Sequence, residues 1–159
     1  MSSDILSIGV LGLDRRGQLA VRAISELPDL RICAVADRDT QKADKAAALL
    51  ECDAYDDYRQ FIIQGEFDCL FVIAGLHSCL EFVRMALKEG IKVLKLAPMA
   101  RDFEEASSLA ELAESQRCRF DIADPGNYIP SFNTFRNVLQ GVAEEKPFLV
   151  RLFCDVGLL

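Results

Sequence analysis

Ser7-Ile-Gly-Val-Leu-Gly-Leu-Asp-Arg-Arg-Gly17 is the stretch of sequence that decides the fold. A short apolar run from Ile5 to Leu11 precedes the break at Gly12, and it has the length of a β-strand. From Gly17 onward, apolar residues recur with helical spacing, at Ala20, Val21, Ile24 and Leu27. A strand, a glycine turn and a helix in this order begin a dinucleotide-binding fold. In such a fold, N–H groups at the start of the helix face a pyrophosphate, and the helix dipole favours negative charge there.

The turn departs from the G-x-G-x-x-G spacing expected of such a fold at its middle glycine, where this chain has Asp14 between Gly12 and Gly17. A carboxylate about 4 Å from a phosphate, at an effective dielectric constant near 20, is repelled by about 4 kcal/mol before screening. Two interpretations remain open. Either Arg15 and Arg16 offset the repulsion by pairing with Asp14 or the phosphates, or nothing binds here and Asp14 only caps the helix.

Strand-like and helix-like segments alternate from this turn to about residue 122. Strands are expected at residues 30–36, 52–55, 68–74, 91–96 and 119–122, and residues 68–74 give the strongest signal because they are continuously apolar. Thr40, Asp56 or Asp57, Ser78, and Asp102 with Glu105 are candidate helix-start signals. The pattern predicts an α/β fold with a doubly wound parallel sheet, a Rossmann fold, over residues 1–123.

The pattern changes in residues 124–159, where a helix at residues 131–144 and a strand at residues 148–154 are expected. This strand has no partner in a simple Rossmann unit. It adds to an edge of the sheet, pairs with another copy to make a homodimer, or continues into a second domain that is only beginning. We therefore expect a C-terminal extension of one helix and one strand.

The composition narrows the classes of partner. The net charge of −7 and the pI near 4.7 argue against nucleic acid and against an anionic membrane surface. No apolar run approaches the ~20 residues that span a bilayer, and no signal peptide is recognised. Six scattered cysteines and the single His77 predict reduced thiols, a cytoplasmic location and no metal site.

Asp37 lies at the end of the second predicted strand, 25 positions after Gly12. In this fold an acidic residue at that point accepts hydrogen bonds from the adenosine ribose and repels a 2′-phosphate, which favours NAD over NADP. The neighbouring Arg38 softens that preference. The alternative is an aspartate in an ordinary strand-to-helix turn. His77 and Cys79 follow the strongest strand at the ligand-binding edge, and a structural role is the alternative for each.

With these residues assembled, the chain resembles the N-terminal half of the Gfo/Idh/MocA family of NAD(P)-dependent oxidoreductases over about residues 4–145. The resemblance is carried by Ile8–Gly12, Val35–Asp39 and Ala86–Leu94, and it continues through Pro98–Ala100 and the following Glu104–Ala106. It implies a Rossmann fold and a cofactor site for NAD. The residues expected at this site are Gly12, Asp14, Arg15, Arg16, Gly17, Asp37, Arg38, Ala74 and His77.

The chain also departs from the family pattern. The family usually has Glu-Lys-Pro after the fifth strand, with the lysine implicated in proton transfer, and matching on Pro98 places Leu96 and Ala97 there. Lys95 shares the strand face of Ala97 but lies deeper along the strand. Ala74-Gly75 stands where the family has Thr-Pro. The family's second, β-rich domain supplies the substrate pocket, and this chain ends where that domain would begin.

These observations favour a Rossmann module without catalytic activity of its own. It would bind a dinucleotide or another small ligand weakly or not at all, and would serve as a ligand-sensing, interaction or signalling domain of a larger protein. The alternative is the cofactor-binding half of a genuine NAD-dependent oxidoreductase whose substrate domain lies outside this chain. A third possibility is a structural module that pairs through its terminal strand.

Overall fold

A computed structural model describes residues 5–75, 79–124, 126 and 129–141. Contacts within the chain divide it into two compact units, residues 1–123 and residues 124–159. Each unit is described separately below.

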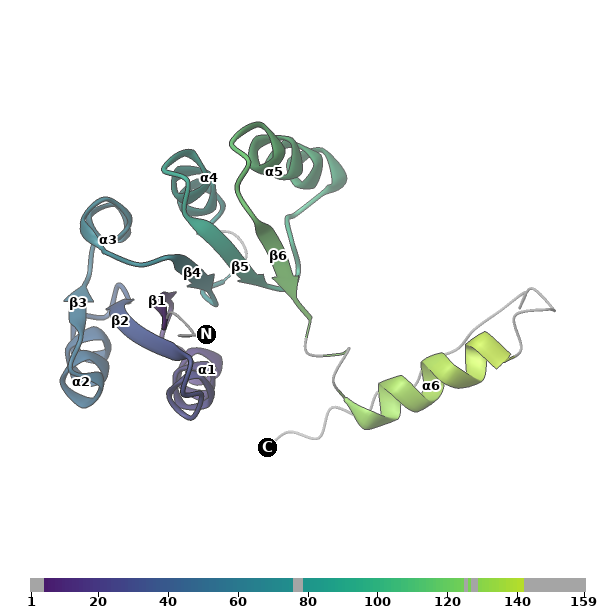
Figure 1. Ribbon diagram of the computed structural model, residues 1–159, viewed down its shortest axis with the longest axis horizontal. Helices are drawn as coiled ribbons and strands as arrows, with labels where there is room; N and C mark the ends of the chain where they lie inside the picture. Colours follow the sequence, from purple (N-terminus) through teal and green to yellow (C-terminus); the bar gives the residue numbers. More distant parts are fainter. Residues whose placement is uncertain (1–4, 76–78, 125, 127–128, 142–159) are drawn as a thin grey trace. The chain divides into compact units, whose positions relative to one another are not determined.

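The first unit is a six-stranded parallel sheet with the strand order β3-β2-β1-β4-β5-β6 (Figure 1). Its strands are β1 (Leu6–Leu11), β2 (Leu30–Ala36), β3 (Asp53–Tyr55), β4 (Cys69–Val72), β5 (Lys92–Leu96) and β6 (Phe120–Ala123). The helices that join them are α1 (Arg15–Ser25), α2 (Thr40–Leu50), α3 (Tyr58–Gln64), α4 (Leu80–Lys88) and α5 (Phe103–Ser115). The strand order reverses at β1, which pairs with both β2 and β4. This topology confirms the predicted doubly wound sheet.

Two apolar cores fill the unit, one on each face of the sheet. On one face, Val21 and Ile24 of α1 pack with Ala43 and Ala47 of α2 against β1 and β2. The opposite face carries α3, α4 and α5 (Figure 1), and their buried residues pack in one cluster with Leu70, Val72 and Val93. The central strands are buried from both sides, which explains why residues 68–74 read as a continuous apolar run.

Aspartates cap four of the five helices of this unit. Asp14 caps α1, Asp39 caps α2, Asp57 caps α3 and Asp102 caps α5, each by accepting at least one backbone N–H with its side chain. The expectation that Thr40 caps α2 is wrong, because the carboxylate of Asp39 reaches the Gln41 N–H and Thr40 already belongs to the helix. Ser78, the predicted start of the next helix, lies outside the described residues.

Leu27 does not join the apolar face of α1. The helix ends at Ser25, and Leu27 is 50% exposed in the turn that follows. The described helix α6 (Pro130–Gly141) of the second unit overlaps the predicted helix at residues 131–144. The predicted strand at residues 148–154 lies outside the described residues. Among the described helices, none has the length and hydropathy needed to cross a membrane.

Candidate dinucleotide site

The glycines of the turn after β1 are required by close backbone packing. Gly12 has φ +99°, and a Cβ added there would lie 2.5 Å from the backbone nitrogen of Ala74. A Cβ on Gly17 would lie 2.1 Å from the carbonyl oxygen of Gly12. Only glycine fits at either position, so the first and last glycines keep the chain geometry of a dinucleotide turn. The turn lies where the strand order reverses, which is where ligands bind in open α/β sheets.

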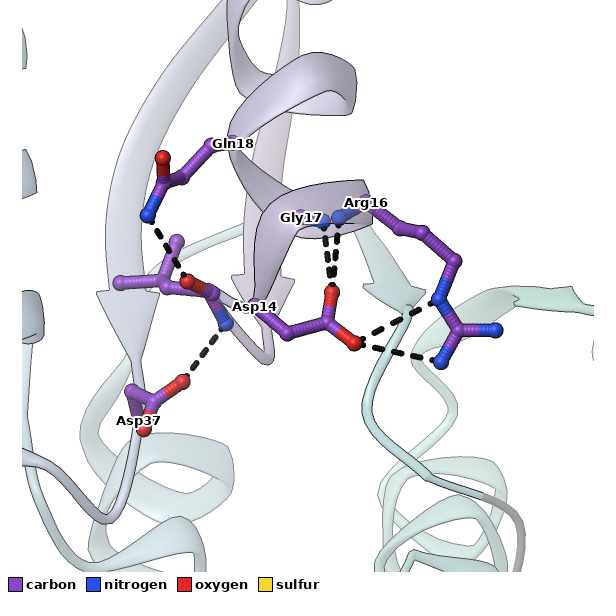
Figure 2. A network of polar contacts seen from close by, with 6 residues as sticks. Asp14, Arg16, Gly17, Gln18 and Asp37 are labelled. Atoms are coloured by element: carbon purple, nitrogen blue, oxygen red, sulfur yellow. Dashed lines mark hydrogen bonds and ion pairs between the residues drawn. The ribbon is translucent and has the colours of Figure 1, made fainter. Parts of the chain in front are cut away.

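Asp14 caps α1 by accepting hydrogen bonds from the N–H groups of the second and third residues of the helix. Its Oδ1 accepts hydrogen bonds from the N–H of Arg16 at 2.9 Å and from the N–H of Gly17 at 3.0 Å (Figure 2). Free N–H groups at such a helix start hold the pyrophosphate in a dinucleotide-binding fold. In this chain the N–H groups of Arg16 and Gly17 instead donate to the carboxylate of Asp14.

Arg16 completes the arrangement from the other side of the carboxylate. Its Nη2 lies 3.2 Å from Oδ2 of Asp14, and its Nε lies 3.4 Å from the same oxygen. Partial burial acts to raise the pKa of Asp14, but the hydrogen bonds from Gly17 and Arg16 and the charge of Arg16 outweigh it and lower that pKa. The carboxylate is therefore charged at neutral pH. Arg15 is exposed and forms no ion pair within the described part of the chain.

Asp37 joins the turn to the end of β2. Its Oδ2 accepts a hydrogen bond from the N–H of Leu13 at 2.7 Å, and its Oδ1 accepts one from the N–H of Asp39 at 2.9 Å. Figure 2 shows Asp37 below the turn, with Gln18 donating to the Leu13 carbonyl from α1 at 3.3 Å. Each carboxylate oxygen accepts more than one hydrogen bond, so Asp37 keeps acceptor capacity for a ribose hydroxyl.

Of the remaining predicted site residues, the structure describes Ala74 and Arg38. Ala74 follows β4 and is in close contact with Gly12, so the structure brings it to the turn. The guanidinium of the exposed Arg38 lies over the ring of Tyr58, 5.6 Å from its centroid. This pair borders a hollow of about 440 Å³, which Asp57 and Phe82 also line. His77 lies outside the described residues.

Lys95 is buried on β5, with a relative exposure of 2%. Its Nζ donates hydrogen bonds to the carbonyl oxygens of Pro98 at 2.5 Å and Leu96 at 3.2 Å. Burial lowers the pKa of this lysine. The ammonium of Lys95 therefore binds carbonyl groups at the end of β5 and in the turn that follows, and these bonds stabilise that turn.

The described residues fit one end of a dinucleotide better than the other. The carboxylate of Asp37, at the end of β2, keeps acceptor capacity that a ribose hydroxyl would need. The pyrophosphate end does not fit as it stands, because Asp14 holds the N–H groups of Arg16 and Gly17 and adds a negative charge. The sequence left both interpretations of Asp14 open. In the structure Asp14 does both: its carboxylate caps α1 and also pairs with the side chain of Arg16.

Sequence reasoning missed the hydrogen bond between Leu13 and Asp37 and the burial of Lys95. The first joins a backbone N–H to a side chain 24 residues away, and no residue type marks such a donor. The burial of Lys95 had a partial signal in the sequence. Lys95 lies two residues after Val93, so the two side chains share one face of β5, and both are buried.

The fold and the glycine turn define a dinucleotide-binding α/β domain. The family model described as "Oxidoreductase family, NAD-binding Rossmann fold" (GFO_IDH_MocA) matches residues 6–123. This chain belongs to that Gfo/Idh/MocA family, and the match confirms the resemblance seen in the sequence.

Two curated relatives illustrate the match. The dTDP-3,4-didehydro-2,6-dideoxy-alpha-D-glucose 3-reductase of Streptomyces antibioticus is 32% identical over 117 residues, which cover 73% of this chain and 36% of the reductase. The rhizopine catabolism protein MocA of Rhizobium meliloti is 25% identical over 146 residues, which cover 92% of this chain and 46% of that protein. The chain therefore spans less than half the length of these relatives.

Among solved structures, scyllo-inositol dehydrogenase from Lactobacillus casei shares the fold. Its apo form superimposes with a TM-score of 0.77 at 18% identity, covering 91% of this chain and 43% of the dehydrogenase. The same enzyme with bound NAD(H) and scyllo-inositol gives a TM-score of 0.76 at 19% identity, covering 87% of this chain and 41% of the other. At this identity the likeness establishes the fold alone.

Proposed function

We propose that this chain is a Gfo/Idh/MocA Rossmann module whose pyrophosphate site is filled by its own Asp14. It binds NAD weakly and performs no hydride transfer by itself. It serves as a ligand-sensing or interaction domain of a larger protein. The observation that carries this proposal is the capture of the Arg16 and Gly17 N–H groups by the Asp14 carboxylate.

The distribution of chemical groups supports the absence of catalysis. Hydride transfer needs a cofactor, a substrate pocket and a group that moves a proton, all held together. Lys95, the lysine nearest to the family's position before Pro98, is almost fully buried and donates to two backbone carbonyls. An ammonium held in this way does not reach a substrate at the edge of the sheet.

A second candidate function is the cofactor half of a genuine NAD-dependent oxidoreductase. It is favoured by the adenosine end of the site, where Asp37 stands in place beside the turn and the tight contacts of Gly12 and Gly17 are kept. In that case, binding of the dinucleotide would have to turn the Asp14 side chain away from the helix. Arg16 would then be freed to pair with a phosphate.

Calorimetric titration with NADH, NAD⁺ and NADP⁺ separates the two functions. We compare the unaltered chain with Asp14→Gly, which restores the glycine, and with Asp14→Asn, which keeps the side-chain volume but removes the charge. Asp14→Gly is expected to bind NADH at least about tenfold more tightly than the unaltered chain, equivalent to about 1.4 kcal/mol. Asp14→Asn should fall between them if both charge and volume matter.

Asp102→Asn is the matched control, because Asp102 caps α5 and accepts the Glu105 N–H at 2.8 Å in a different part of the unit. It should leave NADH affinity unchanged. Micromolar NADH binding by the unaltered chain, with no gain in Asp14→Gly, overturns the proposal and supports the oxidoreductase half instead.

A further inference from the structure

An apolar groove runs along the outer surface between α1 and α2, with a volume of about 690 Å³. Its lining residues follow one stripe on each helix, including Gln18, Val21 and Ser25 on α1 and Lys42, Ala46 and Leu49 on α2. These positions recur every three or four residues, so each helix turns one continuous face toward the groove. Leu13, in the turn before α1, also lines it.

The groove exists because α1 and α2 hardly touch each other. On the opposite face of the sheet, α4 packs against both α3 and α5, whereas α1 and α2 pack on β2 and make little mutual contact. One of the residues with which α2 lines the groove is the small Ala46. One wall carries Leu49, which is 82% exposed and stands among the most exposed large apolar side chains of the described chain.

The rim of the groove is basic, although the whole chain carries a net charge of −7. Arg22, Lys42 and Lys45 line it, against the single carboxylate of Glu26. Arg22 pairs with Glu26 at 3.7 Å, and Lys42 pairs with Asp39 at 3.6 Å, both at exposed positions. Lys45 forms no ion pair within the described part of the chain, so one cation at the rim is available to a partner.

We infer that this groove docks an amphipathic helix whose apolar stripe is flanked by acidic residues. The apolar floor between two parallel walls matches the helix-in-groove mode of recognition, in which leucines spaced i, i+3, i+4 and i+7 enter the groove. The basic rim selects carboxylates on the flanks of that helix. Each wall is 11 residues long, or about 16 Å, so it accommodates about three turns of a partner helix.

This inference extends the proposed role as an interaction domain and does not depend on dinucleotide binding. The probe is a fluorescent helical peptide of about 14 residues, held helical by a side-chain bridge on its outer face, with leucines at the spacing given above and flanking glutamates. A second peptide replaces every glutamate with lysine. Fluorescence anisotropy measures the binding of each peptide to the chain at low and at high salt.

The acidic peptide is expected to bind at least about tenfold more tightly than its lysine counterpart, and the difference should shrink as salt is added. Leu49→Glu and Lys45→Glu should each weaken binding by about fivefold or more. The matched control is Leu19→Glu, because Leu19 is a 62% exposed leucine on α1 that does not line the groove. It should bind the acidic peptide like the unaltered chain.

Several outcomes overturn the inference: equal binding of both peptides, no saturable binding at about 1 mM peptide, or an equal loss in Leu19→Glu and Leu49→Glu. Displacement of the peptide by dodecanoate at concentrations below the peptide Kd also overturns it, and would assign the groove to a small amphiphilic anion. Thermal melts confirm that each variant is folded. NADH titration of Leu49→Glu separates this result from the proposed function, because that variant leaves the turn unchanged.

Discussion

The backbone N–H of Leu13 donates a hydrogen bond of 2.7 Å to the carboxylate of Asp37, and this bond joins the glycine turn after β1 to the end of β2. The same carboxylate accepts the N–H of Asp39, the residue that caps α2. Asp37 is thus a structural residue of the turn as well as the candidate ribose acceptor. Its role in the fold is independent of any ligand.

Asp37→Ala should therefore destabilise the chain even without a dinucleotide. The substitution leaves the N–H of Leu13 without its acceptor in a partly buried setting, which costs about 1–3 kcal/mol in the free energy of unfolding, whereas the exposed N–H of Asp39 can turn to water. Urea denaturation followed by circular dichroism measures this loss. Asp37→Asn, which keeps one side-chain oxygen as acceptor, should lose less. An unchanged midpoint in Asp37→Ala would show that water replaces both bonds at no cost.

Gly17→Ala tests the backbone packing of the turn. The added Cβ would lie 2.1 Å from the Gly12 carbonyl oxygen, so the start of α1 must shift away from the turn. We expect a loss of about 1–3 kcal/mol in the free energy of unfolding, since overpacking of this size forces backbone movement.

Gly75→Ala is the matched control for that substitution. A Cβ at Gly75 meets no atom of the described residues within 4 Å, and the change should stay within about 0.5 kcal/mol. The urea midpoints of Gly17→Ala and Gly75→Ala, measured under the same conditions, give the comparison. Equal midpoints for the two variants would contradict the close contact between Gly17 and Gly12.

The sequence was sufficient to predict the fold because the apolar periods are strong and local. The buried run at residues 68–74 predicted the central strand β4, and the spacing from Gly12 placed Asp37 at the end of β2. The role of Asp14 could not be settled in this way, because capping and phosphate exclusion use the same residue and differ only in side-chain geometry. The groove between α1 and α2 depends on the separation of two helices, which no local pattern encodes.

The burial of Lys95 predicts how stability changes at alkaline pH. Burial lowers the pKa of Lys95 in the folded chain, whereas in the unfolded chain it stays near its ordinary value of about 10.4. Folding must therefore carry an unfavourable buried charge at neutral pH. This cost diminishes as the pH rises from the folded pKa toward the unfolded one.

The matched variant for this effect is Lys95→Met, which keeps a long unbranched side chain without the charge. The free energy of unfolding of the unaltered chain should rise relative to Lys95→Met between about pH 7 and pH 10. Urea denaturation at both pH values gives the difference in the free energy of unfolding between the two proteins. The titration of all other groups is common to both proteins and cancels in this difference. Parallel pH profiles for the two proteins would mean that the buried ammonium is stabilised fully by the carbonyls of Leu96 and Pro98.

The lowered pKa of Glu105 predicts a loss of stability at acid pH. Hydrogen bonds from the Arg101 side chain, the shortest at 2.6 Å, and from the Arg101 N–H lower the pKa of Glu105 to about 2. Because the folded pKa lies below the ordinary value, this carboxylate stabilises the start of α5 above about pH 4.5, and the stabilisation is lost as the pH falls toward 2. The arrangement also differs from a capping box, since Glu105 accepts from Arg101 and not from the N–H of the cap Asp102.

Glu105→Gln should accordingly lower the melting temperature at pH 7 and have progressively less effect as the pH is lowered through 4 toward 2, because the unaltered carboxylate is itself neutralised there. Glu104→Gln is the control, since Glu104 occupies the same first turn, is exposed and forms no ion pair in the described part of the chain. Thermal melts of the three proteins at each pH measure the effect. A Glu105→Gln difference that stays constant from pH 7 to pH 2 would assign its cause to packing around Arg101, because only a charge effect disappears on protonation.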